Sequence, residues 1–202
     1  NYEMTGVIPI TMNIKEVVNA DYNIVNLLSI GLVMIILLLT FKSIALPILL
    51  TLVIECGIFI NMAIPYYVGD SMMFLGYLIV SSIQLGATVD YAILYTNNYL
   101  TFRKTKAKRT ASQMAVDKSL PSIITSGGIL VCAAYLIKWC STINAVSEIG
   151  HLIGRGALLS MFLVIFFLPH VLVLFDKLIE ITNFENIKKR MEARKNKRKE
   201  VK

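Results

Sequence analysis

Long apolar stretches separated by short polar links dominate the pattern of this chain. A helix that crosses the hydrocarbon of a bilayer needs about 20 mostly apolar residues. Five stretches meet this requirement, and they run approximately over residues 24–41, 44–64, 74–99, 120–139 and 149–175. We therefore predict an all-α integral membrane protein in which residues 23–178 form a bundle of five transmembrane helices.

The segments outside the five spans carry weaker patterns. Residues 1–22 are predicted to be the end of an extracytoplasmic domain, with a strand over 7–11 and a short lead-in helix over 14–20. The link between the third and fourth spans predicts an amphipathic helix over 111–119 that lies on the membrane surface.

Composition and charge agree with a membrane protein. The chain is 56% hydrophobic with only 16% charged residues, whereas a soluble domain carries about a quarter. The excess positive charge gathers on one side of the bundle, in the links at Lys42 and 103–109 and in a basic tail over 179–202. Because basic loops stay in the cytoplasm, we predict that the N-terminus lies outside and the C-terminus inside.

The basic tail permits two interpretations. It serves as a solvated topology anchor, or it docks on anionic lipid headgroups, where each basic residue contributes about 1 kcal/mol. Nucleic-acid binding is not expected, because no aromatic residues are interleaved with the basic ones in 188–202.

Three residues that are charged at neutral pH, Glu55, Asp90 and Arg155, fall well inside the predicted spans, away from their ends. Each costs roughly 2.5–3.5 kcal/mol at the bilayer centre on the insertion scale, so each is expected to face the bundle interior or water. A carboxyl in the membrane points to function, although a permanently protonated aspartate also serves as a hydrogen-bonding contact between helices.

The third span is polar on two sides, which predicts a central place in the bundle. At 100° per residue one side carries Asp90, and the other carries Tyr91. The first side consists of Ser82, Gly86, Asp90 and Asn97, and the second of Gln84, Tyr91, Tyr95 and Asn98, with Thr88 at its edge. Between them a narrow apolar stripe is left for lipid, formed by Leu78, Leu85, Val89 and Ala92.

Asp90 and Tyr91 are the candidates for a proton relay. Gly86 lies one turn from Asp90 on the same face, so we expect a neighbouring backbone to approach there and remove water from the carboxyl. Burial disfavours the charged form, which would bring this carboxyl toward titration near neutral pH. The phenol of Tyr91 both donates and accepts hydrogen bonds, so it is placed to tune or relay the proton.

Glu55 and Arg155 lie at similar depths in the second and fifth spans, within about 6 Å of each other along the membrane normal. An ion pair between them would neutralise both charges, and a direct part in transport is the alternative. The fifth span also carries Gly150, Gly154 and Gly156, a small-residue face that favours close helix packing.

The motifs of several enzyme classes are absent from the sequence. There is no phosphate-binding GxxxxGK[ST] loop, no HExxH and no GxSxG. We therefore predict that the chain is not an enzyme, has no metal site and requires no cofactor.

The stretch LGATVDYAILYTNNYLTFRK, with its Gly-x-x-x-Asp-Tyr segment before a basic turn, resembles the MMPL branch of the RND (resistance–nodulation–division) exporters. The following spans, SLPSIITSGGILVCAAYLIKW and SEIGHLIGRGALLSMFLVIFFLPHVLVLFDKL, are similar to the family's last two. The resemblance covers roughly residues 6–178. Glu55 and Arg155 match no residue of the family's pattern.

The resemblance implies a fold and a function. Family members contain two repeats, so this chain would be half of an RND-type membrane domain, with the second-repeat position indicated by the basic tail. Asp90 and Tyr91 would face an Asp-Tyr pair in the missing first repeat and carry the protons that drive export. The expected substrates are lipids, drugs or other amphipathic molecules, and the expected location is the cell membrane, bacterial if the likeness holds. A sterol-sensing-domain-like regulatory module and a channel remain the alternative functions.

Overall fold

The computed structural model of the chain describes residues 7–68 and 74–182, with side chains from Ile24 onward except those of Phe74, Leu75 and Tyr77. The predicted basic tail beyond Thr182 and the first six residues lie outside the described part. The elements in chain order are α1 (Val7–Phe41), α2 (Ala45–Val68), α3 (Phe74–Arg103), α4 (Lys108–Cys140), α5 (Asn144–Phe162), the π-helix η1 (Leu163–Phe167), α6 (Leu168–Leu174) and α7 (Asp176–Thr182).

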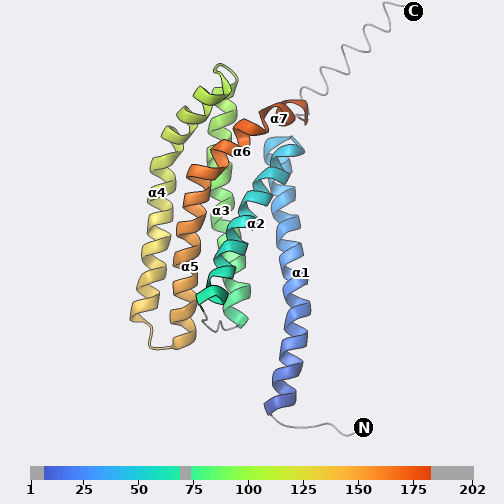
Figure 1. The fold of residues 1–202 in the computed structure, drawn as a ribbon, viewed down its shortest axis with the longest axis vertical. Helices are drawn as coiled ribbons and strands as arrows, with labels where there is room; N and C mark the ends of the chain where they lie inside the picture. The colour runs from blue at the N-terminus through green and yellow to red at the C-terminus, as the bar shows by residue number, and fades with distance from the viewer. Residues whose placement is uncertain (1–6, 69–73, 183–202) are drawn as a thin grey trace, which may run out of the picture.

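Five of these helical segments are long and apolar enough to cross a membrane, as the sequence predicted. They are Ile24–Phe41, Ala45–Val68, Leu78–Arg103, Lys108–Cys140 and Asn144–Leu174. The helices run up and down as one bundle, with α1 standing apart from the others along most of its length (Figure 1). The prediction of an all-α, five-span membrane protein is therefore confirmed.

The segment before the first span differs from the prediction. Residues 7–11 are helical rather than a strand, and they continue without a break into one helix of 35 residues. Pro9 lies in the first turn of this helix, where a missing N–H leaves no intrahelical bond unmade. Pro9 is therefore compatible with the start of a helix.

The predicted surface helix over 111–119 is also not separate. It forms the first turns of α4, and Ala111, Ala115 and Ser119 on one of its sides are buried. Ser112 lies 2.9 Å from the Tyr95 hydroxyl, and Ser119 accepts a hydrogen bond from Asn98. These contacts tie the segment to α3, so it packs against the bundle instead of lying on the membrane surface.

α3 is the central helix, because it packs against α1, α2, α4 and α5. The small-residue face predicted on α5 brings that helix close to its neighbours. A Cβ on Gly150 would lie 2.8 Å from the Ala134 carbonyl oxygen of α4, and one on Gly156 would lie 2.6 Å from side-chain atoms of Asn61 and Gln84. Close packing along α5 therefore depends on glycine at these positions.

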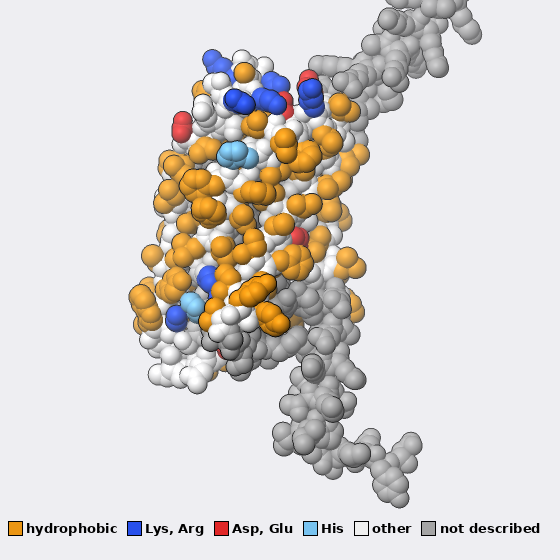
Figure 2. Space-filling view, in the orientation of Figure 1, with side chains coloured by type: hydrophobic (Ala, Val, Ile, Leu, Met, Phe, Trp, Pro, Cys, Tyr) orange, Lys and Arg blue, Asp and Glu red, His pale blue; other side chains and the backbone are white. Residues whose placement is uncertain are grey.

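Lys and Arg side chains gather at one end of the molecule, above a face that is mostly hydrophobic (Figure 2). We call this the basic end, and it comprises Lys42, Arg103, Lys104, Lys106, Lys108, Arg109 and Lys177. The segregation of charge agrees with the pattern used to orient the chain. That the basic end faces the cytoplasm stays a prediction.

Candidate functional site

One face of α3 carries polar residues and is left uncovered by the rest of the chain. Ser82, Gly86, Asp90 and Asn97 share this face as the helical spacing predicted, and all four are exposed. Asp90 lies midway along the span Leu78–Arg103 and has no hydrogen-bond or ion-pair partner among the described residues. A carboxyl is thus presented at mid-membrane depth on an open helix surface.

Gly86 does not receive the neighbour that the sequence predicted for it. A Cβ built there meets no heavy atom within 4 Å, so no helix of the described chain packs on this part of α3. The other helices occupy the remaining sides of α3, which explains why the Asp90 face is the one left open. Any cover over Asp90 must come from outside this bundle.

The apolar stripe of α3 was predicted to face lipid, and this is wrong. Leu85, Val89 and Ala92 are all buried inside the bundle. The two polar sides of α3, one with Gln84 and Thr88 and one with Asp90, lie in different surroundings. The group with Gln84 and Thr88 forms hydrogen bonds to other helices. In the Asp90 group, Ser82 bonds only the Leu78 carbonyl oxygen of its own helix, and Asp90 has no partner among the described residues.

Tyr91 points to a different side of the helix from Asp90. Its side chain is buried, and its hydroxyl oxygen is 3.3 Å from the position that a Cβ on Gly127 of α4 would take. Among the described residues no hydrogen bond joins Asp90 and Tyr91. The two residues are adjacent in sequence, but about 100° of helix rotation separates an outward carboxyl from an inward phenol.

A buried network of amides and hydroxyls connects α2, α3 and α5. Asn61 donates from Nδ2 to Gln84 Oε1 at 2.8 Å, and Gln84 Nε2 donates to Ser160 Oγ at 3.3 Å. Thr88 donates to the same Ser160 oxygen at 2.6 Å. Because buried polar groups in hydrocarbon must be paired within the protein, this network holds the three helices in one register.

Arg155 is bonded to Asn61 and not to Glu55, which corrects the predicted ion pair. Its Nε donates to Asn61 Oδ1 at 2.8 Å and its Nη2 to the Asn61 carbonyl oxygen at 2.9 Å. Gly156 determines this register, because it lets α5 approach α2 at Asn61. Asn61 lies six residues beyond Glu55, about 9 Å farther along α2, so the guanidinium is engaged away from the carboxyl.

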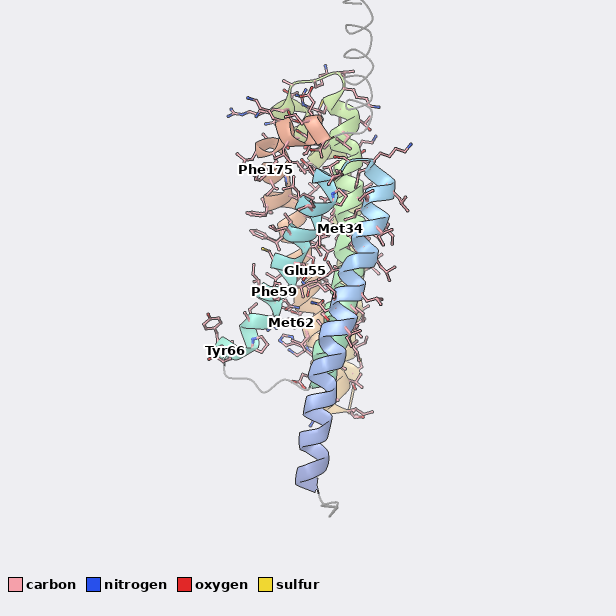
Figure 3. The ribbon with its side chains drawn as sticks, turned by 90° about the vertical axis from the view of Figure 1, so that its right-hand side faces the viewer. Met34, Glu55, Phe59, Met62, Tyr66 and Phe175 are labelled. Atoms are coloured by element: carbon pink, nitrogen blue, oxygen red, sulfur yellow. The ribbon has the colours of Figure 1, made fainter. Side chains whose placement is uncertain are left out.

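Glu55 is half-buried, and its Oε1 atom is buried without a hydrogen-bond partner in the described chain. Figure 3 shows Glu55, Phe59, Met62 and Tyr66 following one another along α2, which diverges from α1 toward Tyr66. Nothing in its contacts connects it with Asp90.

At the basic end, Asp176 joins the start of α7 to the end of α3. Arg103 binds both carboxylate oxygens, with Nη2 to Oδ2 at 2.9 Å and Nε to Oδ1 at 3.0 Å, and the Tyr99 hydroxyl donates to Oδ1 at 2.7 Å. Burial alone would raise the pKa of Asp176, but the hydrogen bonds from Arg103 and Tyr99 outweigh it and lower the pKa below its usual value.

Sequence reasoning did not single out Asn61, Ser160 or Asp176. Asn61 is an amide inside an apolar span, which is itself a signal that a partner exists. Ser160 and Asp176 carry weaker signals, because a serine in a span often bonds its own helix and an acid beside a span end is often solvated.

One known protein family matches the chain over all of its described residues. The sequence model described as the MMPL family matches residues 1–198. No curated protein and no solved structure matches the chain.

Proposed function

The chain belongs to the MMPL family, whose members are RND-type transporters of amphipathic molecules, and from this premise we propose that Asp90 carries the protons that drive export. The chain is a multi-pass membrane protein, and the proposed location is the cell membrane, bacterial if the family's usual setting applies. Protons are the proposed coupling ion, and lipids, drugs or other amphipathic molecules are the proposed substrates.

The observation that carries the proposal is the position of Asp90. Its carboxyl lies at the centre of the central helix, on the side that this chain leaves open. Exposing such a group to lipid is costly, which favours an arrangement where a second bundle covers it. The proposed cover is the other repeat of the parent protein, whose own acidic residue would approach the open space at Gly86.

Support for a proton path comes from the basic end of the same face. A cavity of about 560 Å³ opens between the ends of α1, α3 and α7, and Asn97, Thr101 and Glu180 are among the residues that line it. Asn97 is two helical turns from Asp90, about 10 Å along the axis. We propose that water reaches from this cavity toward Asp90, so that the carboxyl exchanges protons with the basic side.

Tyr91 has a complementary role in this proposal. Its phenol packs toward α4 while the neighbouring carboxyl faces the other repeat. A change in the protonation of Asp90 that rotates α3 would therefore shift Tyr91 against Gly127. This gives the relay a mechanical connection to the rest of the bundle.

Replacing Asp90 tests the proposal. The full-length protein is reconstituted in vesicles with an imposed pH gradient, and proton flux and substrate transport are followed together. Asp90→Asn removes the titratable group at nearly constant size, so we expect both fluxes to fall to the background of empty vesicles. Asp117→Asn, an exposed acid on α4, is the matched control and should retain both.

The alternative functions predict other results. A regulatory module would bind its ligand without any proton-driven transport, even with Asp90 intact. A channel would carry ionic current that does not saturate with substrate. Full transport activity in Asp90→Asn would contradict the proposed role of this residue.

A further inference from the structure

A second cavity at the basic end lies between the first half of α4 and the segment formed by η1 and α6. Its volume is about 700 Å³. One part of its wall is cationic, with Lys108 and Arg109, and the other part is apolar, with Ile165, Phe166 and Val173. It belongs neither to the Asp90 face nor to the buried network of α2, α3 and α5.

The cavity arises from the way α4 and α5 are packed. Far from the basic end, Gly150 and Gly154 bring α5 into close contact with α4. Nearer the basic end the helix widens into η1, where the Leu168 N–H bonds to the Leu163 carbonyl five residues back. Pro169 follows directly, so α6 leaves with a changed direction and a space opens beside α4.

The charge of the cavity favours an anion. Lys108 Nζ donates one hydrogen bond to the Val173 carbonyl oxygen at 3.3 Å, which leaves two ammonium hydrogens for another acceptor. Arg109 is exposed and makes no hydrogen bond within the described chain. Asp117 is the one acid in the wall, so two cations face a single carboxylate.

The apolar part of the wall favours an acyl chain. Phe166 and Leu174 line the cavity and are also exposed at the surface of the bundle, 58% and 74% respectively. The cationic side chains belong to the basic end, and the hydrophobic face of the molecule begins directly below it (Figure 2). A ligand that fills the cavity therefore needs an anionic head and an apolar body.

We propose that this cavity binds an anionic phospholipid, with the phosphate at Lys108 and Arg109 and an acyl chain along Phe166 and Leu174. Basic pockets between membrane helices near the charged surface recognise such headgroups. The other cavity at the basic end is a poorer candidate, because Asp176 and Glu180 lie in its wall and Arg103 is already bound to Asp176.

Quenching of a tryptophan by brominated lipids tests the site. A tryptophan is introduced by Phe166→Trp, or by Leu174→Trp as a second reporter, into full-length protein whose other tryptophans, Trp139 included, are replaced by Phe. One set of vesicles contains phosphatidylcholine mixed with dibrominated phosphatidylglycerol. The other set contains dibrominated phosphatidylcholine mixed with phosphatidylglycerol. We expect phosphatidylglycerol to be preferred at least about fivefold, the effect of one basic residue near a membrane surface.

Two double variants, each of which removes two positive charges, test whether the preference for phosphatidylglycerol arises in this cavity. Lys108→Gln with Arg109→Gln should abolish it, so that both lipids quench equally. Lys104→Gln with Lys106→Gln removes the same charge from the neighbouring link, outside the cavity, and should leave the preference intact. Millimolar glycerol phosphate should not displace the lipid, because it lacks the acyl chain.

Three outcomes overturn the proposal. Equal quenching by both lipids at both reporters in the otherwise unchanged protein shows that the cavity does not select an anionic headgroup. An equal loss in the two double variants shows a general surface attraction. Displacement by glycerol phosphate shows a site for a free anion and not for a lipid.

Discussion

Asn61 is the residue through which the buried polar groups of three helices meet. Its Nδ2 donates to Gln84 Oε1 and to the Leu152 carbonyl oxygen, while its Oδ1 and carbonyl oxygen both accept from Arg155. One side chain thus uses its donors toward α3 and α5 and its acceptor to hold a guanidinium inside the span. An amide is the side chain that provides both functions at this size.

Removing the amide of Asn61 should destabilise the bundle. Asn61→Leu takes away two donors and the acceptor of Arg155 Nε, and we expect the free energy of unfolding to fall by about 1–2 kcal/mol. The measurement is unfolding in detergent titrated with sodium dodecyl sulfate. Gln113→Leu, which removes an exposed amide on α4, should change it by less than about 0.5 kcal/mol. Equal effects of the two substitutions would show that the network contributes nothing specific.

At the scale of elements, α7 is a short helix held to the bundle through its first residue. Asp176 is buried, and its carboxylate receives hydrogen bonds from Arg103 and Tyr99 at the end of α3. A seven-residue helix is too short to be stable by itself in water. The position of α7 therefore depends on this anchor and on the burial of Ile179.

Loss of the Asp176 carboxylate should release α7. Asp176→Asn weakens hydrogen bonds to a charged group, about 2 kcal/mol, so backbone amides of α7 should exchange hydrogen about 30-fold faster at neutral pH. Because the folded pKa of Asp176 is lowered, its contribution is present above the unfolded pKa and is lost as pH falls below about 4. Local stability of α7 in the unaltered protein should therefore decrease in acid, and Asp176→Asn should remove this dependence. An unchanged exchange rate in the variant at neutral pH would contradict the anchor.

At the scale of the whole molecule, the chain is a helix bundle in which one polar face of α3 is not covered by another helix of the described chain. The helices around α3 cover all of its faces except the one with Ser82, Gly86, Asp90 and Asn97. From Ile24 onward α1 is mostly exposed as well, but this surface is rich in leucine and isoleucine, which suit lipid. A surface with a carboxyl at its centre suits a protein partner instead.

Two glycines distinguish a covered face from a lipid-facing one. A Cβ on Gly86 or on Gly31 of α1 meets nothing within 4 Å in this chain. In the full-length protein, Gly86→Leu should lower transport at least about tenfold, because overpacking at a helix contact costs about 1–3 kcal/mol. Gly31→Leu should be tolerated, since its side chain enters lipid. Normal transport in Gly86→Leu would mean that no second bundle packs there.

Sequence alone determined the membrane class, the five spans and the family resemblance of this chain. Each segment that crosses the hydrocarbon must itself be apolar and must satisfy its own backbone hydrogen bonds. The number of spans and their approximate bounds therefore follow from local composition. The spacing of Ser82, Gly86 and Asp90 on one face of α3 also follows, because helix periodicity is local. The strand over 7–11 and the separate surface helix over 111–119 were wrong, because the structure of each segment depends on how it joins or packs against the rest of the bundle.

Only the tertiary structure decided which way each face of α3 turns. Asp90 faces out of the bundle while Leu85 and Val89 face in, the reverse of the lipid-facing stripe that the pattern favoured. Arg155 binds Asn61 and not Glu55, although depth alone permitted either. The physical reason is that helix rotation and register are set by close contacts between helices, such as Gly156 against Asn61, and these contacts join residues far apart in the chain.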